Sequence, residues 1–198
     1  VVPHKHWGTF VVNVSAAFFL GLFDFIHAKA RFSQSIEGAK PKILKFPIVR
    51  LFQARHPLLY LSHQRSGKPV VPLNIELTRQ ENRILVISGP NAGGKSVALK
   101  TTGLLQLMLQ MGFLVPVSEA SEMGIFKNIF LDIGDAQSLE NDLSTYSSHL
   151  NAMKYFMGHA DEHTLFLIDE FGSGTEPQFG GAIAESILSE LVKRKSFG

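Results

Sequence analysis

A lysine and a serine follow a cluster of glycines near the middle of the chain. Gly89 and the triplet Gly94, Lys95 and Ser96 stand at the spacing G-x-x-x-x-G-K-[ST], within the stretch GPNAGGKS. Backbone N–H groups without bulky side chains can wrap a polyphosphate, and this spacing predicts a lysine on the β- and γ-phosphates and a serine hydroxyl on Mg²⁺. The residues predicted to hold ATP here are Gly89, Pro90, Asn91, Ala92, Gly93, Gly94, Lys95, Ser96 and Val97.

Two adjacent carboxylates form a second candidate group. Asp169 ends the apolar run TLFLID, which begins at Thr164, and Glu170 follows it. Asp169 is predicted to hold the magnesium directly or through water, and Glu170 to polarise the attacking water. Paired surface carboxylates with a purely structural role are the alternative, but so apolar a strand before them favours chemistry. Lys95 and Glu170 are therefore the predicted catalytic residues.

Strands and helices must position these groups. The periodicity of apolar residues predicts strands and helices in alternation after the first third of the chain. The predicted strands are Ile84–Ser88, Asn128–Asp132 and Thr164–Asp169, and the predicted helices are Val97–Gln110, Tyr146–Ala160 and Gly180–Lys193. Such alternation is typical of an α/β sheet with mostly parallel strands. Between residues 48 and 88, short apolar segments interrupted by prolines predict small edge strands.

The N-terminal region is the most apolar part of the chain. Phe10–Ile26 is interrupted by Asn13, Ser15 and Asp24, and it falls short of the roughly 20 apolar residues that a membrane span needs. It predicts a buried helix, with a signal peptide as the weaker alternative. A polar and basic stretch follows, and we expect a domain boundary near Gly38.

The composition sets broad limits. The 198 residues are enough for one good-sized core, and 19 basic against 17 acidic residues give a net charge of only +2. Charge therefore does not point to nucleic acid. The absence of cysteine excludes a disulfide framework and a cysteine metal site, and it suits the cytoplasm.

Three motifs in this order resemble the ATPase domain of the MutS family. They are GPNAGGKS, the helix start at Ser144, Thr145 and Tyr146, and DEFGSGTEP. The stretch DIGDAQSLENDLSTYSSHL narrows the resemblance to the bacterial MutS paralogue branch that carries a C-terminal Smr nuclease domain. The resemblance implies an ABC-class P-loop NTPase fold, mostly parallel with a small antiparallel edge. It divides the chain into residues 1–40, a helical remnant of the core and lever, and residues 41–198, an ATPase domain truncated before its last strands.

The resemblance also implies a function. By the resemblance, the chain is an ATP-hydrolysing motor domain of a protein that acts on branched DNA or recombination intermediates, with stalled ribosomes as another proposed substrate. DNA would be held mainly outside this chain, and no nuclease residue can be assigned within it. A dimerisation switch without turnover, and a transporter-type nucleotide-binding subunit, are the alternatives. The transporter signature L-S-G-G-Q is replaced by DLSTYSSHL, which disfavours a membrane partner.

The helix start is the third predicted part of the nucleotide site. By the resemblance, two copies of the chain would form a homodimer through the nucleotide face, and Ser144 and Thr145 would face the γ-phosphate held by the other copy. An ordinary helix N-cap is the alternative role for these hydroxyls. Gln137 is predicted to sense magnesium and the γ-phosphate.

Overall fold

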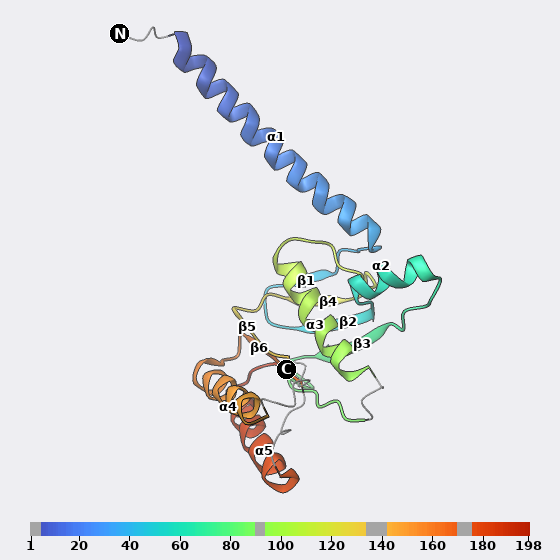
Figure 1. Cartoon of the computed structure of the whole chain (residues 1–198), viewed down its shortest axis with the longest axis vertical. Coiled ribbons are helices and arrows are strands. Elements are labelled where there is room, and N and C mark those ends of the chain that lie inside the picture. The colour runs from blue at the N-terminus through green and yellow to red at the C-terminus, as the bar shows by residue number, and fades with distance from the viewer. Residues whose placement is uncertain (1–4, 90–93, 134–141, 170–175) are drawn as a thin grey trace.

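The computed structural model describes residues 5–89, 94–133, 142–169 and 176–198. A long helix leads into a compact body of two small sheets with helices against them (Figure 1). The elements are α1 (Lys5–Ser35), β1 (Lys42–Leu44), β2 (Val49–Ala54), α2 (Pro57–Ser66), β3 (Leu73–Leu77), α3 (Lys95–Gln110), β4 (Glu122–Gly124), β5 (Asn128–Asp132), α4 (Asp142–His159), β6 (Thr164–Ile168) and α5 (Pro177–Lys193).

Helix α1 contacts the body near its C-terminal end and projects away from it (Figure 1). Near that end, the ring of Phe32 packs edge to face against Phe113, and Ile36 is fully buried. The Lys29 ammonium donates a hydrogen bond of 2.6 Å to the Met111 carbonyl, just after α3. Further out, the apolar side chains of residues 18–26 are exposed, up to 70% at Phe23. The expectation of a buried helix is therefore wrong for this part of the chain.

The strands form two separate sheets. The first has the order β1-β4-β2-β3, in which β1 runs parallel to β4 whereas β2 runs antiparallel to both β3 and β4. The second pairs β5 with β6 in parallel. The expected ABC-class P-loop NTPase fold with a mostly parallel sheet is therefore wrong, because the structure is a small mixed α/β arrangement. An apolar run predicts that a strand exists, but its partner and direction depend on contacts far along the chain.

Helix α3 joins the two sheets. Its Leu105 and Leu109 are buried in one core with Leu51 of β2 and Met123 of β4. On its other side, a Cβ atom added at Gly103 would lie 2.8 Å from Leu167 Cδ1 of β6. A side chain at position 103 would therefore require the Leu167 side chain to shift. Helix α3 is thereby fixed against β6 as well as against the four-stranded sheet.

A second, smaller core lies between β5, β6 and the helices α4 and α5. Phe156 of α4 stacks on Phe130 of β5 with ring centroids 5.0 Å apart, and Phe166 of β6 is buried beside them. Helix α5 contributes Ile187 and Leu191, which are also buried. Aromatic and branched side chains thus hold α4 and α5 on this sheet.

The predicted strand over Ile84–Ser88 is not formed. The segment makes a single bridge-like contact, in which Leu85 N donates to the Gly198 carbonyl and Gly198 N donates to the Arg83 carbonyl. Val86 is 70% exposed. A strand needs a continuous ladder of backbone hydrogen bonds. In the described structure this segment pairs with one residue, Gly198, which is too little to form a ladder.

None of the helices in the described residues is long and apolar enough to span a bilayer.

Helix α2 falls in a stretch from which only edge strands were expected. The helix begins at Pro57, and proline is well suited to the first turn of a helix. It ends before Gly67, which adopts the left-handed conformation that glycine allows at a helix end.

Candidate functional site

The glycine loop ends at a helix N-terminus that lacks an N-cap side chain. Gly94 precedes α3 with φ of 83°, and Gly89 has φ of 143°; both angles favour glycine over residues with a side chain. The N-cap residue is Gly94, so the start of α3 has no capping hydrogen bond from an N-cap side chain. The first N–H groups of a helix lack partners within it, and they carry a partial positive charge. The start of α3 is therefore suited to an anion such as a phosphate.

Lys95 reaches back from the start of α3 to Gly89. Its ammonium donates a hydrogen bond to the Gly89 carbonyl. A phosphate oxygen is a stronger partner for an ammonium group than a carbonyl is. Ser96 follows in the first turn and is partly exposed. Pro90, Asn91, Ala92 and Gly93, the other predicted loop residues, lie outside the described residues.

Asp169 stands directly after β6, at the carboxyl edge of the β5–β6 sheet. Its backbone N–H donates to the Asp132 carbonyl at 2.9 Å, which ties it to the end of β5. Helix α3 packs against β6 at Gly103, so the helix that starts at the glycine loop also contacts the strand that precedes Asp169. The carboxyl edge of parallel strands is a common place for ligands in α/β proteins. Glu170 lies outside the described residues.

Asp132 and His149 form a contact that sequence reasoning missed. His149 Nδ1 of α4 lies 2.7 Å from Asp132 Oδ2, and the two side chains are 26% and 15% exposed. The sequence offered a partial signal, because Asp132 ends an apolar strand just as Asp169 does. Nothing in the sequence indicated the role of His149, because its partner lies on another element and depends on where α4 packs.

Three further predicted residues are only partly covered by the structure. Ser144 and Thr145 lie in the first turn of α4, which begins at Asp142, but their side chains are outside the description. Gln137 lies outside the described residues altogether.

The donor set suits magnesium bound through a substrate. Among the described residues, no group of three or more histidine, aspartate or glutamate side chains could hold a metal ion. The predicted ligands, Ser96 and Asp169, would supply one hydroxyl and one carboxylate. Mg²⁺ in nucleotide sites commonly takes one or two protein oxygens and completes its shell with phosphate and water. These two residues therefore fit the Mg²⁺ of a bound nucleotide better than an independent metal centre.

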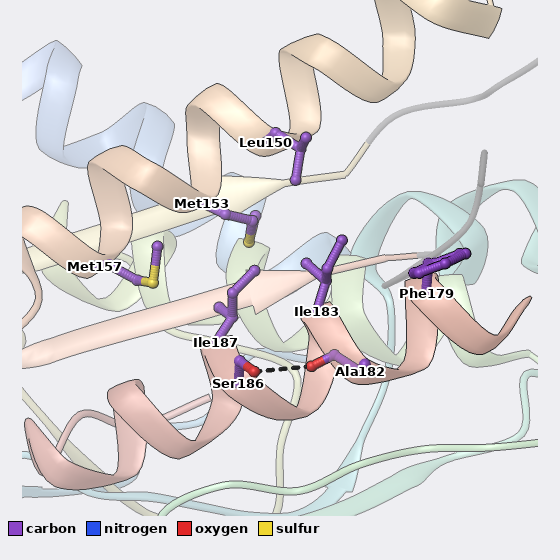
Figure 2. Close-up of a pocket in the computed structure, with 8 residues that line it drawn as sticks. All are labelled: Leu150, Met153, Met157, Phe179, Ala182, Ile183, Ser186 and Ile187. Atoms are coloured by element: carbon purple, nitrogen blue, oxygen red, sulfur yellow. Dashed lines mark hydrogen bonds between the residues drawn. The ribbon is translucent and has the colours of Figure 1, made fainter. Parts of the chain in front are cut away.

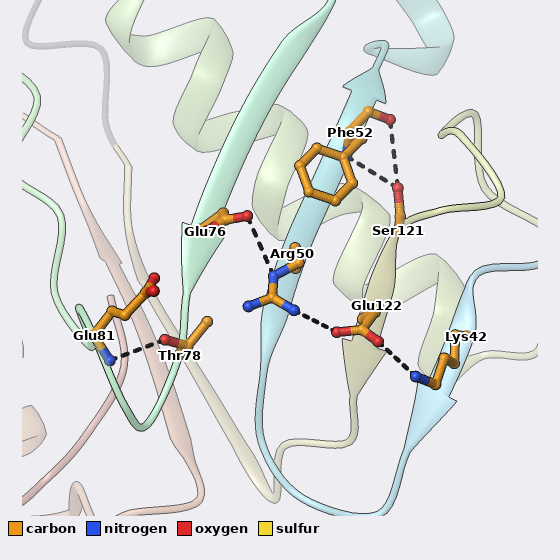
Figure 3. A network of polar contacts seen from close by, with 8 residues as sticks. All are labelled: Lys42, Arg50, Phe52, Glu76, Thr78, Glu81, Ser121 and Glu122. Carbon is orange, nitrogen blue, oxygen red and sulfur yellow. Dashed lines mark hydrogen bonds and ion pairs between the residues drawn. The ribbon is translucent and has the colours of Figure 1, made fainter.

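The outer face of the four-stranded sheet is a second place where charges gather (Figure 3). Glu122 of β4 pairs with Lys42 at 2.7 Å and with Arg50 at 2.6 Å, and Arg50 also lies 3.2 Å from Glu76. The hydrogen bond from Lys42, with the help of Arg50, lowers the pKa of the Glu122 carboxyl from its ordinary value. These charges form ion pairs with one another, so the row is a structural network, in which the pair of Arg50 Nε with Glu76 is not hydrogen-bonded.

An apolar groove of about 500 Å³ lies between α4 and α5 (Figure 2). Its only hydroxyl belongs to Ser186, which donates to the Ala182 carbonyl at 2.9 Å within α5. The residues that line it are Leu150, Met153, Met157, Phe179, Ala182, Ile183, Ser186 and Ile187. Without a charged or titratable group, this groove cannot perform acid–base or phosphoryl chemistry.

A glycine turn at a helix start is typical of proteins that bind phosphate groups, and the carboxyl ends of parallel strands are a common ligand-binding edge in α/β proteins. The family described as MutS domain V matches residues 85–197. This is more than half of the 198 residues, and the chain belongs to the MutS family.

Curated relatives extend this match toward the N-terminus. Endonuclease MutS2 of Lactiplantibacillus plantarum is 44% identical over 178 residues, which cover 90% of this chain and 22% of the relative. Endonuclease MutS2 of two Staphylococcus aureus strains is 45% identical over 174 residues, covering 88% of this chain and 21% of each relative. The chain thus spans about a fifth of the length of the curated relatives it matches.

Proposed function

We propose that this chain binds Mg-ATP at the glycine loop and hydrolyses it, as the nucleotide-driven part of a MutS-family protein. The observation that carries the proposal is the start of α3, with Gly94 as N-cap in the left-handed region and the Lys95 ammonium hydrogen-bonded to the Gly89 carbonyl. A helix start with this loop before it can receive a polyphosphate through backbone N–H groups. The G-x-x-x-x-G-K-[ST] spacing at the same place supports the proposal independently.

Each residue then has a distinct task. Lys95 exchanges its carbonyl partner for the β- and γ-phosphates, and its charge stabilises the negative charge that develops on the transferred group. Ser96 and Asp169 hold Mg²⁺, which neutralises phosphate charge when the nucleotide is bound. Glu170 orients the attacking water. Phosphoryl transfer depends mainly on such positioning and charge stabilisation, so a hydroxyl, a carboxylate, an ammonium group and a base are sufficient protein groups.

We further propose that two copies of the chain meet across the nucleotide. Helix α4 begins at Asp142, so Ser144 and Thr145 fall in its first turn, where the helix dipole and free N–H groups favour an anion. These residues would face the γ-phosphate held by the other copy, with Gln137 close to the metal. ATP would then be sandwiched in a homodimer, and hydrolysis would release it.

The substrate of the complete protein is proposed to be DNA with branches or recombination intermediates. The curated relatives are named endonucleases, and the chain spans about a fifth of their length. A net charge of only +2 supports DNA contacts that lie mainly outside this chain. We assign no nuclease residue to the chain. The lack of cysteine supports a reducing compartment, and we propose the cytoplasm.

The experiment that tests the proposal is an ATP titration of the complete protein with Lys95→Ala. A charge-assisted hydrogen bond contributes about 1.5–3 kcal/mol, so the variant should bind Mg-ATP at least tenfold more weakly. Lys100→Ala, which removes an exposed lysine five residues further along α3, is the matched control and should bind as the unmodified protein does. Unchanged affinity in the Lys95→Ala protein would reject the proposed site.

A second variant separates binding from hydrolysis. Glu170→Gln keeps a side chain of the same size but removes the charge that orients water, so Mg-ATP should still bind while phosphate release falls by two or more orders of magnitude. The nucleotide-bound dimer should then accumulate, as light scattering would show. If phosphate release is undetectable even in the unmodified protein while ATP still binds, the chain is a dimerisation switch without turnover.

A further inference from the structure

The contact between His149 and Asp132 joins α4 to the carboxyl edge of the β5–β6 sheet. Nδ1 of the ring lies 2.7 Å from Oδ2 of the carboxylate. An ionised carboxylate can only accept hydrogen bonds, so Nδ1 carries the proton and donates it. The side chains are only 26% and 15% exposed, and a charge-assisted bond sheltered from water in this way is stronger than one at the surface.

Asp132 holds two partners at once. Its side-chain carboxylate accepts from His149, and its backbone carbonyl accepts from the backbone N–H of Asp169 at 2.9 Å. The same residue therefore fixes α4 and the proposed metal ligand to the end of β5. A displacement of Asp132 would therefore shift both α4 and Asp169.

The remaining contacts of α4 with β5 lie further along the helix. Phe130 stacks on Phe156 with centroids 5.0 Å apart, and it meets Tyr155 edge to face at 5.5 Å. Phe156 is about two turns beyond His149, whereas Ser144 and Thr145 are only about one turn before it. His149 is thus a polar anchor between α4 and the end of β5, and it lies nearer to the start of α4 than these aromatic contacts do. Its loss removes one link between the first half of α4 and β5, while the aromatic contacts still hold the second half.

We propose that His149 is a positioning residue for ATP hydrolysis. Through Asp132, it sets the distance and direction of the first turn of α4, with Ser144 and Thr145, relative to Asp169 at the proposed nucleotide site. The inference rests on the proposed ATPase function. Because phosphoryl transfer is sensitive to misplacement of about 1 Å, loss of the anchor should reduce turnover much more than nucleotide binding.

The test measures kcat and KM for phosphate release, the Kd for Mg-ATP and the unfolding temperature in the complete protein. His149→Ala should lower kcat by about tenfold to hundredfold and leave Kd within about threefold. In His149→Asn, the side-chain amide nitrogen can take the place of Nδ1 and donate to Asp132, so most of the turnover should return. The matched control is His159→Ala, which removes an exposed histidine later on α4 that contacts only Tyr155 among the described residues, and it should leave kcat unchanged.

A double variant tests whether the two residues act as a unit. His149→Ala combined with Asp132→Ala should lose no more turnover than the worse single variant, because either change breaks the same bond. A kcat for His149→Ala within twofold of the unmodified value would overturn the proposal. So would a fall in kcat that Asn does not restore, or one that follows the loss of unfolding temperature, since both indicate a merely structural role.

The Lys95→Ala protein separates failure of this inference from failure of the proposed function. If Lys95→Ala abolishes ATP binding while His149→Ala hydrolyses ATP normally, the site stands and the positioning role is wrong. If the unmodified protein neither binds nor hydrolyses ATP, the proposed function is wrong and the positioning role falls with it.

Discussion

The outer face of the four-stranded sheet carries a row of ion pairs, whereas the helices on the β5–β6 sheet leave an apolar groove between them (Figures 2 and 3). In the first region Lys42, Glu122, Arg50 and Glu76 alternate in sign and neutralise one another. In the second region Leu150 and Phe179 remain 37% and 64% exposed. In the first region the charged side chains pair with one another. In the second region, apolar side chains of α4 and α5 remain exposed to solvent.

This difference separates a closed framework from a region that carries part of the proposed nucleotide site. The four-stranded sheet and α3 share a core in which Val49, Leu51, Leu105 and Met123 are fully buried, and this core holds the helix that starts at the glycine loop. The β5–β6 half carries Asp132 and Asp169 at its strand ends and presents the first turn of α4. A rigid support that carries a less tightly packed working region is a common arrangement, because ligand-binding elements need local freedom.

The largest effect should come from adding one methyl group in the sheet region. A Cβ atom at Gly124 would lie 2.0 Å from the Phe46 carbonyl oxygen and 2.8 Å from Ile48 N, and both are backbone atoms that cannot move aside alone. Gly124→Ala should therefore lower the free energy of unfolding by at least about 4 kcal/mol. In the other region, a Cβ at Gly158 of α4 meets nothing within 4 Å. Gly158→Ala should stabilise the helix by about 0.5–1 kcal/mol. Urea unfolding of both variants would test this contrast, and equal stability of the two would refute it.

A smaller effect should follow from removing one leucine side chain in each region. Leu51 of β2 is fully buried, so Leu51→Ala leaves a cavity and should cost about 2–5 kcal/mol. Leu150 borders the groove and is 37% exposed, so Leu150→Ala should cost less than about 1.5 kcal/mol. Thermal unfolding gives the comparison directly. A cost at Leu150 that equals the cost at Leu51 would mean that the groove is covered in the intact protein.

The smallest effect concerns the ion pairs and depends on pH. Lys42 and Arg50 hold the pKa of the Glu122 carboxyl below its ordinary range, which is about 4.3 in an unfolded chain. A group with a lowered folded pKa stabilises the protein above the unfolded value, and this contribution is lost as the pH falls through the folded pKa. Glu122→Gln should therefore be less stable than the unmodified protein at neutral pH, and the difference should disappear in acid. Urea unfolding across this pH range measures it. Glu185→Gln, which changes an exposed carboxylate of α5, is the matched control for the loss of one negative charge.

Local sequence patterns predicted several elements well. The strand Asn128–Asp132 is confirmed with the same bounds, and the next predicted strand, from Thr164, ends one residue early at Ile168. The helix expected over Val97–Gln110 begins two residues earlier, at Lys95. These segments have strong apolar periodicity and are bounded by glycine or polar residues, so local preference and tertiary packing agree.

Other elements could not be predicted because their conformation depends on distant partners. The apolar run Ile84–Ser88 has strand composition, but strand formation needs a neighbouring backbone, and in the described structure its backbone hydrogen bond is with Gly198. The apolar helix expected to be buried is exposed over residues 18–26, because burial depends on what lies beside a helix.

By itself, the sequence determined the candidate chemistry of this protein: the glycine loop with Lys95 and Ser96, and the carboxylate Asp169 after an apolar strand. These are local features, since the spacing of a loop before a helix and the composition of a strand are both read within about ten residues. Only the tertiary structure decided which strands pair, that Gly103 brings α3 against Leu167, and that His149 meets Asp132. The physical reason is that each of these contacts joins residues separated by many positions along the chain, and the folding of everything between them sets their distance.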